Sequence, residues 1–165
     1  MTLIQDKILS GERPLYGSRD LRLERVTIGE GESALKECSH VEAHECVFEG
    51  RYIFWECENV ECRNCHFTSD DRAPLWYGKN IRMHDCIMDA PKVFRELDGL
   101  TLENIQISDG AEAFWYCKNG HLSNLTMQRA EYAFMQSHKL QINNLTLQGK
   151  YTFQYARNIE IHNAV

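Results

Sequence analysis

The stretch Phe114-Trp115-Tyr116-Cys117-Lys118-Asn119 decides the fold, because it recurs in altered form along the chain. Related copies are Phe54–Asn59, Leu75–Asn80 and Phe153–Asn158. Each copy begins with a large apolar residue, has a small residue in fourth place and ends on Asn. Copies of this pattern return every 19–21 residues. Self-similarity at a period of this length is the signature of a repeat architecture.

Six positions of the repeat hold apolar or small residues in nearly every copy. Inward positions two residues apart indicate a short strand, and inward positions three apart indicate a corner between strands. Asn, Asp and Gly gather at two of these corners, where their tolerance of positive φ is useful. The residues that follow the first corner are Leu21, Val41, Val60, Ile81, Leu100, Gly120, Leu140 and Ile159. This pattern predicts three short strands per coil and no helix.

The fold class that follows is all-β, a single-stranded right-handed parallel β-helix with three sides. About seven to eight coils of 19–21 residues fit into the 165 residues. Leucine-rich repeats have a similar period, but the aromatic column takes the place of their convex segment. Pentapeptide repeats fail because the coil length drifts. The right-handedness is expected from the general rule for parallel crossovers and from no particular residue.

We expect one domain over residues 1–165. Residues 1–14 are predicted to be an N-terminal cap segment in which Ile4, Ile8 and Leu9 cover the open end of the core. Residues 15–165 form the stacked coils, of which the last is incomplete at Val165. The loop Thr68–Pro74 is two residues longer than the commonest length.

Composition narrows the partners and the compartment. The net charge is −6 and no basic run exists, which argues against a nucleic-acid partner because phosphate contacts need clustered Lys and Arg. No stretch is long and apolar enough to span a bilayer. The N-terminus lacks the order of a secretory signal, and the seven cysteines are an odd number. We therefore expect reduced thiols in a cytoplasmic protein without a membrane partner.

Four runs of sequence resemble a known bacterial family, the domain of unknown function 3737. They are Gly11–Tyr16, Gly31–Cys38, Ala90–Glu96 and Phe153–Tyr155. The resemblance implies a right-handed β-helix of the pectate-lyase-like group and covers essentially the whole chain. It brings no reaction, cofactor or catalytic residue. It also implies further coils in relatives, so we expect this chain to correspond to the N-terminal part of a longer array.

The aromatic corner is the best place for a binding site, because its two outward columns hold every tryptophan of the chain. Aromatic rings stack on the apolar faces of sugars, and carboxylates bind hydroxyls. The predicted ligand-binding residues are Trp55, Trp76, Trp115, Tyr77 and Tyr116. Catalytic candidates are restricted to Glu56, Glu96 and Arg95, with the two carboxylates two coils, or about 10 Å, apart at the backbone. Inverting glycosidases hold two carboxyls at a roughly similar separation.

A metal site is the alternative use of the cysteines. Cys57, Cys62, Cys65 and His66 lie within one coil, and Cys62 and Cys65 have the spacing of zinc ligands. The repeat explains this spacing without a metal, since the three cysteines fall in three different inward columns. We predict no metal and no cofactor.

Two functions remain open. The first is a non-catalytic scaffold that binds another protein or a second copy of itself, through the aromatic face or through the uncapped edge near Ile159 and Ile161. The second is a β-helix that binds or processes an oligosaccharide on the Trp, Glu and Arg ladder. The aromatic column favours an interaction surface over an active site, so we expect no enzyme.

Overall fold

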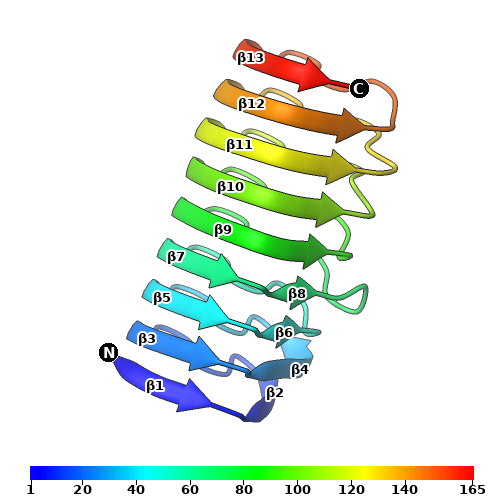
Figure 1. Cartoon of the computed structure of the whole chain (residues 1–165). Coiled ribbons are helices and arrows are strands. Elements are labelled where there is room, and N and C mark those ends of the chain that lie inside the picture. The colour runs from blue at the N-terminus through cyan, green and yellow to red at the C-terminus, as the bar shows by residue number, and fades with distance from the viewer.

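The computed structural model describes all residues 1–165 as a single stack of parallel strands (Figure 1). The 13 strands are β1 (Thr2–Gln5), β2 (Ile8–Glu12), β3 (Arg19–Glu24), β4 (Thr27–Glu32), β5 (Ser39–His44), β6 (Val47–Phe48), β7 (Glu58–Arg63), β8 (His66–Phe67), β9 (Lys79–Met88), β10 (Asp98–Ile107), β11 (Lys118–Met127), β12 (His138–Leu147) and β13 (Arg157–Ala164). No helix long and apolar enough to cross a membrane is present.

Each coil places its strand beside the matching strand of the next coil. The main path runs β1-β3-β5-β7-β9-β10-β11-β12-β13, and a second path runs β2-β4-β6-β8 and joins β9. Every pairing is parallel, and Leu21 faces Val41, which faces Val60. This register equals the period read from the sequence. The prediction of a parallel β-solenoid of about eight coils is therefore confirmed, whereas its right-handedness stays a prediction.

The expectation of three separate strands per coil needs correction. From β9 to β12 the first two predicted strands continue through the corner as one strand of ten residues. The aromatic side consists of turns, because alternate residues have positive φ: 63° at Tyr52, 58° at Phe54 and 56° at Glu56. Strand residues ordinarily have negative φ, and β9 to β12 depart from this only at isolated corner residues, whereas here every second residue does so. Backbone hydrogen bonds still join these turns from coil to coil, as when Leu75 N–H donates to Ile53 O at 2.8 Å.

A column of phenylalanines fills the core beneath the aromatic side. Phe94 and Phe114 stack with ring centroids 4.7 Å apart, Phe114 and Phe134 at 4.6 Å, and Phe134 and Phe153 at 4.6 Å. Burial of one such side chain stabilises the fold by about 1.5–3 kcal/mol. This burial offsets the strain of holding bulky residues at positive φ, where few non-glycine residues are found.

The corner asparagines behave as the sequence predicts. Asn104, Asn124 and Asn144 have φ of 56°, 53° and 60°. Their side-chain amides form a ladder in which Asn124 donates to Asn104 at 2.9 Å and Asn144 donates to Asn124 at 3.0 Å. The ladder satisfies side-chain groups along the axis while the backbone turns.

The segment expected to cap the N-terminal end is itself a coil. Strand β1 pairs with β3, and β2 pairs with β4, in parallel like the other coils, with a register shift between Leu9 and Gly11 of β2. Ile4 and Leu9 pack against the core, as expected of a covering segment. Ile8 does not, because it alternates with Leu9 along β2 and is 78% exposed.

Candidate functional site

The tryptophans form one continuous stack with an arginine inside it. Trp55 and Trp76 lie face to face, with ring centroids 5.0 Å apart and planes inclined by 8°. The Arg95 guanidinium lies 4.2 Å from the centroid of Trp76 and 4.5 Å from that of Trp115. Both faces of Trp76 are therefore occupied, one by Trp55 and the other by Arg95, and Arg95 also covers one face of Trp115.

The indole N–H groups are also used within the protein. Trp55 Nε1 donates to Ala73 O at 2.6 Å, and Trp76 Nε1 donates to Lys92 O at 2.7 Å. Trp115 Nε1 donates to Tyr132 O at 2.6 Å. Each acceptor lies on the turn of the next coil. The bonds press the three rings against the molecule, so the tryptophans are half-buried and present edges, with their faces directed along the axis.

Arg95 is held in place by its neighbours. Only 18% of its side chain is exposed, and Nη2 lies 3.4 Å from the Glu112 carboxylate. Its Nε is buried without a hydrogen-bond partner. Two aromatic faces and one carboxylate thus stabilise the guanidinium, since cation–π contacts strengthen when the cation is desolvated. Arg95 is therefore a structural part of the tryptophan stack.

Glu56 and Glu96 are both exposed and lie two coils apart, with the coil of Tyr77 between them. The coil spacing puts their backbones about 10 Å apart. Tyr77 lies in the same outward column, so a phenol ring occupies the position between the two carboxylates. The predicted site residues therefore do share one face, but the structure separates the carboxylates with a side chain.

Tyr77 and Tyr116 are exposed aromatic residues of this face, as is Tyr155 further along the same column. Tyr77 and Tyr116 are 42% and 44% exposed. Tyr77 meets Trp76 edge-to-face at 5.8 Å and 87°, and Tyr116 meets Trp115 at 6.4 Å and 84°. Each tyrosine ring is therefore nearly perpendicular to the tryptophan ring beside it. This geometry limits the rotation of the tyrosine rings.

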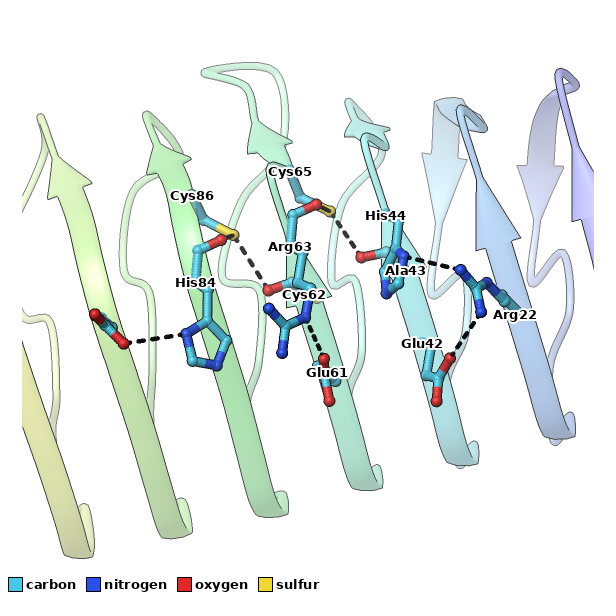
Figure 2. Close-up of polar contacts among 11 residues, drawn as sticks. Arg22, Glu42, Ala43, His44, Glu61, Cys62, Arg63, Cys65, His84 and Cys86 are labelled. Atoms are coloured by element: carbon cyan, nitrogen blue, oxygen red, sulfur yellow. Dashed lines mark hydrogen bonds and ion pairs between the residues drawn. The ribbon is translucent and has the colours of Figure 1, made fainter.

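The outward face of the main sheet carries a polar network (Figure 2). Glu61 accepts a hydrogen bond from Arg63 Nε, which lowers the pKa of Glu61. His84 Nδ1 lies 3.4 Å from the Glu103 carboxylate. Arg22 Nη2 lies 3.4 Å from His44 Nδ1. Along one column of the strands the order is Arg22, Glu42, Glu61 and Arg82, so two adjacent glutamates lie between two arginines and the network largely neutralises itself.

A shallow hollow of about 270 Å³ lies beside this network. Its walls come from three successive strands, β5, β7 and β9, and from the corners before them. The lining residues are His40, Val41, Glu42, Asn59, Val60, Glu61, Asn80 and Arg82. The hollow has no aromatic wall, and its carboxylate Glu61 is already paired to Arg63.

The cysteines lie in the core. All seven are free and buried. Six of the thiols donate to backbone carbonyls of the preceding coil, as in Cys57 to Leu35 O at 2.8 Å and Cys65 to Ala43 O at 3.3 Å. Burial raises the pKa of the Cys117 thiol to about 12. No group of three or more His, Cys, Asp or Glu side chains has the arrangement of a metal site.

Sequence reasoning missed Asp71, which lies in the long loop Thr68–Pro74. Its side chain is buried, with 1% exposed. Oδ1 accepts from Arg72 N–H at 2.6 Å, and Oδ2 has no partner. Burial raises the pKa of this carboxyl well above its ordinary value. The signal was available, because Gly50 and Ala90 occupy the matching position in the adjacent coils.

Comparison with known proteins supports the resemblance seen in the sequence. A family model described as a protein of unknown function (DUF3737) matches residues 2–165. No curated protein matches the chain. The match carries no assignment to a pectate-lyase-like group, and that grouping stays a prediction. Since the matched region covers nearly the whole repeat array, the chain belongs to the DUF3737 family.

Proposed function

We propose that this chain is a non-catalytic β-solenoid scaffold whose aromatic face binds a protein surface. The proposal rests on one observation, that the tryptophans and the tyrosines of that face make different contacts. The tryptophans use ring faces and N–H groups for contacts within the molecule, whereas Tyr77 and Tyr116 remain exposed beside them. Rigid tyrosines offer a large amphipathic contact area at a low entropic cost, which is typical of protein interfaces.

The arrangement gives less support to oligosaccharide binding. Sugar recognition by stacking needs a free ring face, and both faces of Trp76 are in contact with Trp55 and Arg95. The ring of Tyr77 also lies in the column between Glu56 and Glu96. Both observations favour an interaction surface over a catalytic cleft.

A photo-crosslinking amino acid tests the proposal in the intact protein. We place p-benzoylphenylalanine at position 116 on the aromatic face and, as the matched control, at position 101 on the sheet face, where Thr101 is also exposed. Irradiation of living cells is expected to give a protein adduct from position 116 and none from position 101. The adduct should be lost when Tyr77→Ala is added. No adduct from position 116, or equal adducts from both positions, would overturn the proposal.

A further inference from the structure

One edge of the solenoid changes character from coil to coil. Two outward residues flank an inward residue where the aromatic turn meets the first strand. Together they form what we call the striped edge, which consists of Glu56 and Glu58, Tyr77 and Lys79, Glu96 and Asp98, and Tyr116 and Lys118. Acidic pairs alternate with pairs of one tyrosine and one lysine. Over these four coils the pattern therefore repeats every second coil, and it ends at Ser39 on one side and His138 on the other.

Strand pairing holds these stripes in line. Glu58 faces Lys79, Lys79 faces Asp98, and Asp98 faces Lys118 in the parallel register. Neighbouring stripes are thus about 4.8 Å apart, and like stripes are about 10 Å apart. The side chains are accessible, with 46% of Lys118 and 44% of Asp98 exposed. The striped edge therefore presents acidic and basic side chains in alternation, at the regular spacing of the coils.

Resting on the proposed interaction role of this face, we propose that the partner is a second copy of this chain, packed side by side and antiparallel. The two-fold axis lies between β9 and β10. Lys79 of each copy then faces Asp98 of the other, and Glu58 of each faces Lys118 of the other. In the neighbouring column, Tyr77 faces Glu96 and Tyr116 faces Glu56. Each contact occurs twice, as a two-fold interface requires.

Other arrangements of two copies leave at least one charged residue of the four central coils without a partner of opposite charge. A two-fold axis through the coil of Asp98 places Asp98 on Asp98 and Lys79 on Lys118. An axis one coil further on, between β10 and β11, brings Lys79 against His138. A parallel arrangement in register pairs every charge with its own kind, and a parallel arrangement shifted by one coil does not close. The axis between β9 and β10 makes all four central stripes complementary.

The protein already uses the contacts that this interface needs. The Tyr16 hydroxyl donates to the Glu37 carboxylate of the adjacent coil. Lys118 Nζ lies 3.8 Å from the Asp98 carboxylate in the same chain. A tyrosine–glutamate bond and a lysine–aspartate pair are therefore compatible with the spacing and reach of side chains on this surface.

Charge reversal and its repair test the register. We compare the wild type with Lys79→Glu, Asp98→Lys and the double variant by sedimentation at several concentrations. The wild type is expected to dimerise, more tightly at 50 mM than at 500 mM salt. Each single variant should dimerise about tenfold more weakly, because the two-fold axis doubles each repulsive contact. The double variant should recover wild-type affinity, since both contacts are restored with reversed sign.

Thr101→Lys, which changes the charge of the same coil on the sheet face, serves as the control and should leave the dimer unchanged. Thermal melting of every variant shows that the fold is retained. If a dimer forms but the double variant stays weak, this interface is wrong. A wild type that stays monomeric also overturns it. The crosslink from position 116 is read separately, so an adduct with a different protein would leave the proposed function standing while refuting self-association.

Discussion

Asp71 is expected to destabilise the folded protein at neutral pH, so its removal should stabilise it. In the adjacent coils the same position, two residues ahead of a residue with positive φ, holds Gly50 and Ala90. Both are small and buried, and neither brings a polar side chain into the core. Asp71 places a carboxyl there with one oxygen unpaired. The insertion in the loop Thr68–Pro74 gives the carboxyl only the amide of Arg72 as a partner.

The magnitude follows from the unpaired oxygen. A buried acceptor without a partner costs about 1–3 kcal/mol. In Asp71→Ala this cost disappears, and the freed amide of Arg72, an exposed residue, can be hydrated. For a domain of this size each kcal/mol moves the melting temperature by about 2–4 °C. We therefore expect Asp71→Ala to raise the melting temperature at pH 7 by roughly 2–12 °C.

The pH dependence gives a second readout. Burial raises the folded-state pKa of Asp71 above the ordinary value of 3.8. The unfolded state therefore loses this proton first as the pH rises. The contribution of Asp71 to stability is fully present below pH 3.8 and is lost as the pH rises through the raised pKa. The isosteric variant Asp71→Asn removes the titration, so its advantage over the wild type should grow from pH 4 to pH 7.

Thermal melts followed by circular dichroism at pH 4 and pH 7 measure both effects. Asp70→Ala is the matched control, because Asp70 is the neighbouring residue and is exposed. It should change the melting temperature little at either pH. A lower melting temperature for Asp71→Ala at pH 7 would refute the reasoning. It would mean that the buried carboxyl is compensated by a group that these contacts do not include.

Three further predictions concern the scaffold. Trp76→Ala should lower the free energy of unfolding by about 3 kcal/mol, because it removes the ring between Trp55 and Arg95. Tyr77→Ala should lower it by about 1 kcal/mol, and urea denaturation measures both values. Gly31→Ala should lower the free energy of unfolding by about 3 kcal/mol, since its Cβ would lie 1.8 Å from Gly11 O. Gly17→Ala should lower it less, because nothing lies within 4 Å of its Cβ. Equal melting temperatures for the two variants would contradict this prediction. None of the seven cysteines should react with a thiol reagent before unfolding, since all are buried.

The repeat explains why so much of the fold could be predicted. In a solenoid every coil contacts only its neighbours, so one period of the sequence determines one turn of the structure. Inward residues such as Val60 and Ile81 follow from spacing alone, and corners such as Asn104 follow from tolerance of positive φ. The positive φ of Phe54 and Phe114 could not be predicted, because bulky residues rarely adopt it and only the stacked core stabilises it.

The sequence predicted which residues form the aromatic column, but it did not predict which parts of their side chains are exposed. Spacing placed Trp55, Trp76 and Trp115 on one face, and the structure brings them together. Spacing carries no information on side-chain torsions, which decide whether a ring presents its face or its edge. The role of Arg95 as the layer between two rings depends on the same torsions.

The aromatic side needs its stack for a structural reason. Its turns have alternating positive φ and therefore lack the continuous strand pairing that joins β9 to β10 on the main sheet. The stack of Trp55, Trp76, Arg95 and Trp115 supplies contacts between coils on the side where the ladder is weakest. At the centre of the stack both faces of Trp76 are in contact with neighbours, and neither is free for a partner. The next residue of each coil has no such task, and recognition therefore falls to the position of Tyr77 and Tyr116.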